Sequence, residues 1–249
     1  DISNHSHILG TDGNYNASNQ ITDQAIRGGG TSGGNAVPRR PQVYAAANNG
    51  TGNQYGSVIE YFSLLNQLKN AIVVGNWNAN ANAIRGSSSL GPAYDGRIKP
   101  DVMAPGTNII SPGTTGDGEC APAGTNNNSG YDGCSGTSMA APAVAGVLAL
   151  MLEAWEDTYD VDVDDNPPLP STLRAILIQT ATDMVVANLR GSAEVDSDSD
   201  GTNGNDGAGN ATATVGPDFA TGWGMTNASS AIALLQDTRD EGGSVPVPN

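Results

Sequence analysis

Short, uniformly apolar runs alternate along the chain with longer amphipathic stretches. Residues 43–47 (Val-Tyr-Ala-Ala-Ala) and 71–74 (Ala-Ile-Val-Val) are apolar throughout, which is typical of buried strands. The first is followed by an Asn-Asn-Gly turn, and we expect Gly75 to end the second. Residues 1–6 predict a further short strand. Residues 21–26 and 58–68 predict helices that connect these strands.

The strongest helical pattern covers residues 137–155. Apolar residues occupy nearly every side of this segment, so we expect the helix to be buried. Pro142 falls near the first turn, where a missing backbone N–H costs least. Ser171 is a candidate N-cap for a helix over 172–183, and residues 228–235 predict the last helix.

This alternation predicts an α/β fold: a mostly parallel sheet between helices, in which chemistry is found at the carboxyl ends of the strands. We expect one domain over residues 1–249, with residues 194–209 as an acidic Gly/Asp loop insertion. The glycine-rich run at 28–34 lacks the Lys-Ser/Thr end of a phosphate-binding loop, so it gives no support to nucleotide binding.

Charge narrows the classes of partner. The 249 residues include 26 acidic and 10 basic side chains, a formal net charge of −16. This field repels phosphate backbones and anionic lipid surfaces, so we expect neither nucleic acid nor membrane as a partner. No apolar run reads as long enough to span a bilayer.

The two cysteines, Cys120 and Cys134, bracket a Gly/Asn-rich stretch that could not pack by itself. A disulfide between them would stabilise the fold by roughly 3 kcal/mol in the chain-entropy model. Two free buried thiols are the alternative. If the bridge forms, the compartment is oxidising, and we expect a secreted or extracellular protein.

Chemistry is concentrated in residues 135–142 (Ser-Gly-Thr-Ser-Met-Ala-Ala-Pro). Ser138 stands at the amino end of the predicted buried helix, where unpaired N–H groups and the helix dipole stabilise negative charge. Gly136 leaves room for a substrate backbone to approach, which suits a nucleophile. The alternative is that Thr137 or Ser138 is an ordinary N-cap.

Residues 136–142, followed by Val-Ala-Gly at 144–146, closely resemble the nucleophile motif of subtilisin-like serine peptidases. Four more segments resemble this family in the same order. They are the oxyanion-asparagine turn at 45–50, the following core strand at 69–75, the loop before the nucleophile at 88–92 and 95–106, and the closing turn at 221–227. The resemblance covers nearly the whole chain and implies a subtilisin-like three-layer fold.

The resemblance also implies a serine endopeptidase that acts on extended polypeptides and needs no cofactor for chemistry. Ser138 would form the acyl-enzyme, and the Asn48 amide with the Ser138 backbone N–H would hold the oxyanion. The residues expected to line the substrate cleft near them are Ala46, Ala47, Gly136 and Thr137. Without the resemblance, Asn48 reads as a turn-forming asparagine.

The expected constellation is incomplete. A serine nucleophile needs an oriented base, yet the family's aspartate and histidine motifs are absent and the chain has only His5 and His7. Residues 5–11 superficially resemble the histidine motif, but His5 stands 43 positions before Asn48, much closer than the family places its histidine. Residues 1–6 are more similar to the family's strand that lines the substrate cleft, which makes Ser6 and His7 candidates for the cleft wall.

We therefore expect this chain to be the carboxyl-terminal part of a subtilisin-like catalytic domain. Its partners would be the polypeptide substrate and the missing amino-terminal part of the same domain. By itself it should hydrolyse little or nothing, because the serine lacks its base. The alternative is a non-catalytic pseudopeptidase, a binding module of the same fold.

One acidic segment is a weak candidate for a metal site. Residues 196–201 (Asp-Ser-Asp-Ser-Asp-Gly) start like a calcium loop, with Asp196, Asp198 and Asp200 as candidate ligands. The twelfth position is Gly207 in place of the usual glutamate, so a solvated acidic loop is the alternative. Calcium is common in the resembled family, but none of its sites maps onto these residues.

Overall fold

The computed structural model describes residues 1–11, 13–32, 35–36, 38–50, 63–112, 131–184 and 216–240. Its central sheet contains four parallel strands, β1 (Ser3–His5), β4 (Gln42–Ala45), β5 (Ile72–Asn78) and β7 (Val102–Pro105). β4 lies between β1 and β5, and β7 pairs with the other side of β5. A short strand, β6 (Ala83–Ile84), runs antiparallel to the end of β5. The predicted, mostly parallel sheet is confirmed.

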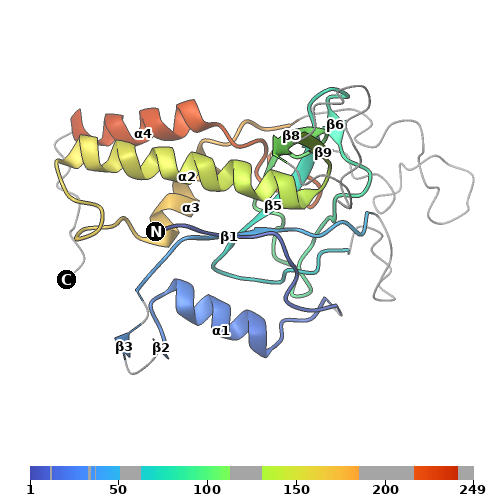
Figure 1. The fold of residues 1–249 in the computed structure, drawn as a ribbon, viewed down its shortest axis with the longest axis horizontal. Helices are drawn as coiled ribbons and strands as arrows, with labels where there is room; N and C mark the ends of the chain where they lie inside the picture. The colour runs from blue at the N-terminus through green and yellow to red at the C-terminus, as the bar shows by residue number, and fades with distance from the viewer. Residues whose placement is uncertain are drawn as a thin grey trace, which may run out of the picture.

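Helices cover both faces of this sheet. α2 (Thr137–Tyr159) and α4 (Ala228–Asp240) lie side by side on one face, α1 (Ala17–Ile26) covers the other, and α3 (Pro170–Gln179) packs beneath α2 and α4 (Figure 1). Two antiparallel pairs stand apart from the sheet: β2 (Thr31–Ser32) with β3 (Asn35–Ala36), and β8 (Ile109–Pro112) with β9 (Tyr131–Cys134). These layers confirm the expected α/β class.

The core is split by the alternation of side chains along β4 and the residue that follows it. Val43 and Ala45 join the cluster beneath α2, whereas Tyr44 and Ala46 join the cluster beneath α1. All four side chains are buried. A strand buried on both faces explains why residues 43–47 read as one apolar run.

The two main helices extend beyond their predicted bounds. α1 starts four residues early because Asn16 and Asn19 form a reciprocal capping box. α2 starts at Thr137 as predicted but continues to Tyr159. It is not buried on all sides: Ala140, Val144, Leu148 and Met151 face the core, while Leu150 is 47% exposed.

α2 also corrects the expectation that no segment could span a bilayer. By length and composition alone, this 23-residue helix is apolar enough to do so. In the structure it lies along the sheet and against α4. Its hydrophobicity therefore serves a helix that covers four strands at once.

The helix predicted over 58–68 is wrong where it can be compared. Residues 63–68 are buried but not helical. Polar side chains hold this segment: Ser63 Oγ accepts from Leu90 N–H, and Asn66 Nδ2 donates to the carbonyls of Ala45 (2.7 Å) and His7 (2.9 Å). These bonds replace the helical ones, because a buried backbone or amide group must be paired in some way.

Two predicted boundaries also move. β5 continues through Gly75 to Asn78, and a Cβ at Gly75 would lie 2.4 Å from Met103 Sδ, so this glycine makes room for β7. α3 begins at Pro170 with Leu169 as N-cap, not at Thr172 after Ser171. Proline suits the first helical position because it has no N–H to satisfy there.

Three sequence-based predictions fall outside the described residues. These are the loop insertion at 194–209, the calcium ligands Asp196, Asp198 and Asp200, and Cys120. Cys134 lies at the end of β9 and is 7% exposed. The disulfide and the calcium site stay predictions.

Candidate active site

Ser138 lies in the first turn of α2, at the carboxyl ends of the parallel strands. The N-cap is Gly136, which supplies no capping side chain. The Ser138 backbone N–H has no hydrogen-bond partner within the described residues. An open N–H at the positive end of a 23-residue helix is suited to stabilising an anion.

Ser6, the residue that follows β1, contacts Ser138. Ser6 Oγ donates to the Ser138 carbonyl at 2.9 Å, and Ser138 Oγ donates to the Ser6 carbonyl at 3.4 Å. This reciprocal contact joins residues 132 positions apart. It places Ser6, a predicted cleft-wall residue, directly beside the predicted nucleophile.

Asn48 is fixed by its carbonyl oxygen. Asn48 Oδ1 accepts from the Thr137 N–H at 2.9 Å and from Thr137 Oγ1 at 3.1 Å. Because the oxygen is used in this way, the Nδ2 group keeps its two N–H donors for another acceptor. The side chain is exposed, so that acceptor can come from solvent or from a ligand.

The residue before Asn48 has an unusual backbone. Ala47 has a φ of 100°, a conformation that residues with a Cβ rarely adopt. Its N–H donates to Thr137 Oγ1 at 3.3 Å, which keeps the strained turn against the start of α2. The strained backbone at Ala47 turns the chain so that the Asn48 side chain reaches the start of α2.

Thr137 has a different role from the one its motif suggested. Its side chain is fully buried, and its hydroxyl accepts from Ala47 and donates to Asn48. The buried Thr137 side chain therefore orients Asn48. Its place in a substrate cleft stays a prediction. Ala46 and Ala47 are also buried, so any contact that a ligand makes with these two residues would involve their backbone.

Two glycines allow this close packing. A Cβ at Gly136 would lie 3.3 Å from Asn48 Nδ2, and one at Gly106 would lie 2.6 Å from the Gly136 carbonyl oxygen. The Gly136 N–H donates to the Gly106 carbonyl at 2.8 Å. The end of β7 thus braces the turn that carries Ser138.

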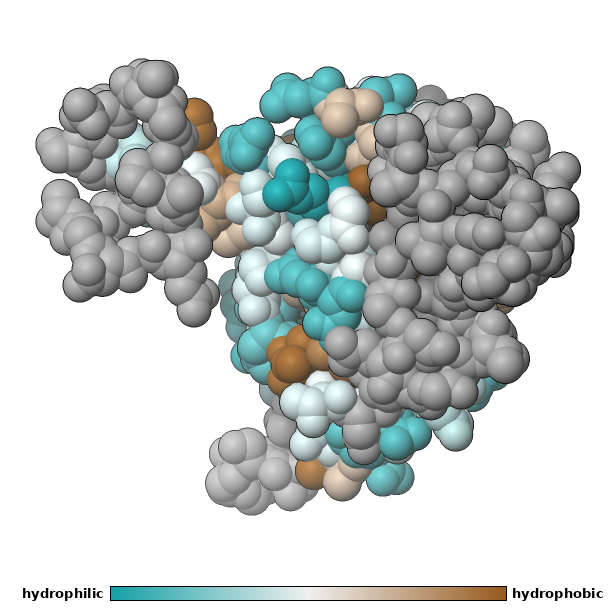
Figure 2. Space-filling model, turned by 90° about the vertical axis from the view of Figure 1, so that its right-hand side faces the viewer, coloured by the Kyte–Doolittle hydropathy of each residue, from teal (hydrophilic) through white to brown (hydrophobic). Residues whose placement is uncertain are grey.

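Figure 2 looks onto this end of the molecule, and its described part is mostly hydrophilic or neutral with small hydrophobic patches.

Neither histidine contacts Ser138. His5 stacks on Tyr44 with ring centroids 4.3 Å apart, and His7 meets the same ring edge-on at 5.8 Å. Both rings therefore pack against Tyr44, and among the described residues neither forms a hydrogen bond with Ser138. Burial, with a smaller contribution from the neighbouring His7 charge, lowers the pKa of His5. Among the described residues, no imidazole is placed to take a proton from Ser138.

A charged cluster lies at the opposite ends of the strands, their amino ends. Asp101 is fully buried and accepts from Lys99 Nζ, from the Val73 N–H at 2.7 Å and from Arg174 at 2.6 Å. Burial lowers the pKa of Lys99 to about 8, against the opposing charge of Asp101. Burial would raise the pKa of Asp101, but Lys99 and Arg174 outweigh it and the pKa is lowered. The sequence motif at 95–106 contains Lys99 and Asp101, but it does not show that these two side chains pair inside the core.

The model of the subtilase family matches residues 1–224. The chain belongs to the subtilase family. The match includes the β1 strand, the Asn48 turn and the start of α2, all of which meet around Ser138. The family predicted from the motifs is confirmed.

Curated relatives match shorter stretches of this subtilase chain. The serine protease/ABC transporter B family protein tagB of Dictyostelium discoideum is 36% identical over 110 residues, 41% of this chain and 6% of that protein. The subtilisin-like protease SBT3.8 of Arabidopsis thaliana is 35% identical over 97 residues, 39% of this chain and 10% of that protein. The C5a peptidase of Streptococcus pyogenes is 40% identical over 72 residues, 29% of this chain and 5% of that protein. The chain thus spans a small part of these proteins.

Solved structures support the fold. The prenylagaramide maturation protease PagA superposes with a TM-score of 0.55 at 20% identity, over 94% of this chain and 61% of that one. The self-cleaved protease domain of PatA superposes with a TM-score of 0.53 at 21% identity, over 98% of this chain and 63% of that one. The expected subtilisin-like fold is confirmed at this level.

Proposed function

We propose that this chain is the nucleophile-bearing part of a serine endopeptidase, with Ser138 as the nucleophile. One observation carries the proposal: Ser138 lies at an open helix end beside Asn48. The Asn48 oxygen accepts from Thr137, and its Nδ2 donors have no partner among the described residues. A hydroxyl between two such donors suits attack on a carbonyl better than it suits simple helix capping.

The proposed reaction is acyl transfer. Ser138 Oγ attacks the scissile carbonyl while a base takes its proton, and the carbonyl oxygen becomes an oxyanion between Ser138 N–H and Asn48 Nδ2. Each donor of this kind is worth roughly 2.7–4 kcal/mol. The base then protonates the leaving amine, and water hydrolyses the acyl-enzyme on Ser138 by the same route.

The base and its carboxylate would come from a polypeptide segment outside these 249 residues. His5 and His7 are the only histidines in the sequence, and both rings pack on Tyr44, away from Ser138. A single edge of β1 is paired within the described part of the chain, so the other can receive a strand. A stripe on α2 is exposed and apolar, which suits a packed helix: Pro142, Ala143, Gly146, Ala149 and Leu150.

The proposal extends to substrate and setting. An extended polypeptide would pass Ser6 on its way to Ser138, and the chemistry needs no cofactor. We propose a secreted or extracellular protein with a Cys120–Cys134 disulfide, supported by the net charge of −16 and the cysteine spacing. A structural calcium at Asp196, Asp198 and Asp200 is part of the same proposal, supported by their alternating carboxylates.

The second candidate function is a pseudopeptidase that binds polypeptides without cleaving them. The orientation of His5 and His7 favours it, because the described residues supply no base to Ser138. In that case the open donors at Asn48 and Ser138 would hold a peptide carbonyl without subsequent attack.

Fluorophosphonate labelling separates these functions. The chain is to be compared alone and joined to its upstream coding segment, with Ser138→Ala as the blank and Ser135→Ala as the control for a nearby exposed hydroxyl. We expect labelling in the joined protein, its loss in Ser138→Ala, and its retention in Ser135→Ala. If the joined, folded protein does not label at Ser138, the endopeptidase proposal fails and the pseudopeptidase remains.

A further inference from the structure

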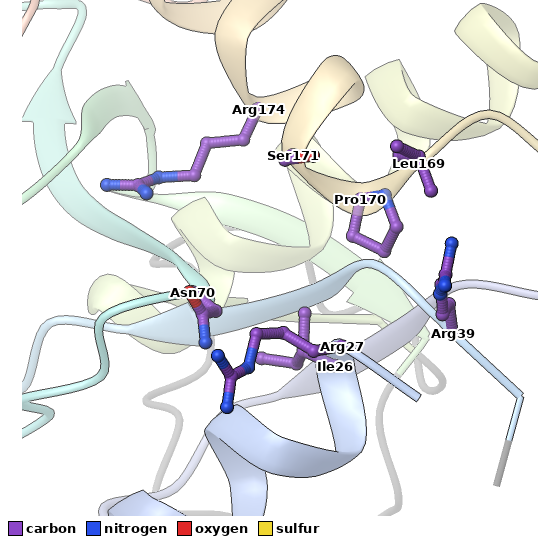
Figure 3. Close-up of a pocket in the computed structure, with 8 residues that line it drawn as sticks. All are labelled: Ile26, Arg27, Arg39, Asn70, Leu169, Pro170, Ser171 and Arg174. Atoms are coloured by element: carbon purple, nitrogen blue, oxygen red, sulfur yellow. The ribbon is translucent and has the colours of Figure 1, made fainter. Parts of the chain in front are cut away.

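A cavity of about 260 Å³ lies at the end of the molecule opposite Ser138. It is lined by the end of α1, the start of α3, Asn70 two residues before β5, and the segment that leads into β4. Figure 3 shows the side chains that line it, among them Arg27, Arg39 and Arg174 from three separate elements. We call it the arginine cavity.

The charge of this cavity is opposite to that of the protein. The chain has 26 acidic and 10 basic residues, yet three of those ten line the arginine cavity, and among the described residues no aspartate or glutamate lines it. Two buried carboxylates stand behind the lining: Asp101 pairs with Arg174, and Asp23 accepts from the Asn70 N–H. Such a concentration in a chain of net charge −16 is a local positive field within a negative one. It would select a compact anion and reject the extended phosphate backbone of a nucleic acid.

Two of the three guanidinium groups form no ion pair within the part of the chain that the structure describes. These are Arg27 and Arg39, and both residues are exposed. Arg174 is held by Asp101 and by the Lys69 carbonyl at 3.1 Å, so it is a fixed wall of the cavity. Asp101 is already shared with buried Lys99, which leaves this cluster with two cations to one carboxylate.

The remaining lining matches a small ligand. The first turn of α3 has no side-chain cap at Leu169 and borders the cavity, so its dipole adds to the arginine field. Ile26 and Leu169 supply apolar walls. The Asn70 side chain also lines the cavity, but its Nδ2 group donates to the Asp23 carbonyl at 3.1 Å. Arginine forks bind planar or tetrahedral oxyanions in a bidentate way.

We propose that the arginine cavity binds a small multivalent oxyanion, a phosphate or a polycarboxylate. Binding would join α1 to α3 across the amino ends of β4 and β5, far from the nucleophile. The ligand would therefore stabilise the fold without competing with a polypeptide at Ser138. The proposal does not depend on peptidase activity.

Calorimetric titration of the full chain with inorganic phosphate and with citrate tests the site, with chloride at matched ionic strength as the blank. The informative variants are Arg27→Gln and Arg39→Gln, and Arg85→Gln is the control because Arg85 is also exposed but does not line the cavity. We expect each cavity variant to weaken binding about tenfold and the control to leave it unchanged. Circular dichroism would verify that all three variants fold.

The two anions identify the source of the ligand chemistry. Tighter binding of phosphate indicates a phosphorylated ligand, and tighter binding of citrate indicates a carboxylate ligand. The tighter anion should also raise the melting temperature more, and this rise should be lost in Arg27→Gln and Arg39→Gln. Such a result supports the proposal independently of the calorimetric titration. Binding that is absent for both anions, matched by chloride, or equally weakened by Arg85→Gln would overturn it.

Discussion

The Lys99–Asp101–Arg174 cluster and the Ser138–Asn48 site lie at opposite ends of the same parallel strands and use polar groups in opposite ways. At the amino ends, both carboxylate oxygens of Asp101 are occupied, by Lys99 and Val73 on one side and Arg174 on the other. At the carboxyl ends, the donors of Ser138 N–H and Asn48 Nδ2 are open among the described residues. At the amino ends, polar groups that are all hydrogen-bonded hold the strands together. At the carboxyl ends, donors without a partner leave a place where a reacting atom can bind.

Removing Asp101 should have the largest effect on stability. Asp101→Ala leaves Lys99 buried and without its partner, which costs about 3–5 kcal/mol of unfolding free energy. Urea unfolding followed by circular dichroism measures this loss. Asp95→Ala is the matched control, because its pair with Arg97 has a carboxylate that is 44% exposed and should be worth about 1 kcal/mol or less. Similar losses in both variants would contradict the contrast between a buried and an exposed pair.

Asn48→Ala tests the other end of the strands. With the base supplied by the upstream segment, we expect kcat to fall about 10²–10³-fold, because one oxyanion donor is lost. Stability should fall by about 1–3 kcal/mol, because the buried Thr137 hydroxyl loses its acceptor. Thr137→Val keeps the donor but removes the hydroxyl that orients it, so its loss of kcat should be smaller than that of Asn48→Ala. Steady-state peptide hydrolysis measures both. An unchanged kcat in Asn48→Ala would mean that Asn48 is only a turn residue.

Acid should weaken the amino-end cluster specifically. The folded pKa of Asp101 is below its unfolded value of about 3.9, so the unfolded chain binds more protons as the pH falls below that value. Stability from Asp101 is therefore complete above about pH 4 and is lost through the folded pKa, by at most about 1.4 kcal/mol per pH unit. Urea unfolding at a series of pH values should show this slope, and Asp101→Asn should flatten it. An equal slope in the variant would assign the acid loss to other carboxylates.

The sequence predicted correctly those strands and helices whose signal lies in their own residues. Residues 71–74 read as a buried strand because they are apolar without interruption, and α2 began at Thr137 as predicted because small residues and Pro142 mark a helix start. Residues 63–68 were misread because bonds from Asn66 to positions 21 and 59 residues away hold them. Such bonds leave no periodicity in the sequence.

The site was predictable to the same extent. Motif resemblance placed Ser138 and Asn48 together, and the structure brings Ser6 to them across 132 positions. The buried, orienting hydroxyl of Thr137 was not anticipated, because a threonine beside a nucleophile reads equally as a cap or a cleft residue. The signal that could have revealed it is the pair of small residues Ala46–Ala47 before Asn48, because small side chains let this turn approach the Thr137 hydroxyl.

Ser6→Ala should have the smallest effect and shows how tightly the open end is organised. The variant removes the bond from Ser6 Oγ to the Ser138 carbonyl, worth about 1 kcal/mol or less because water replaces it at an exposed position. We expect an unchanged melting temperature but a few-fold slower fluorophosphonate labelling of Ser138 in the joined protein. Ser3→Ala is the control, because its hydroxyl contacts His5. If both variants slow labelling equally, β1 supports Ser138 as a whole strand, and the Ser6 contact has no separate part in placing the nucleophile.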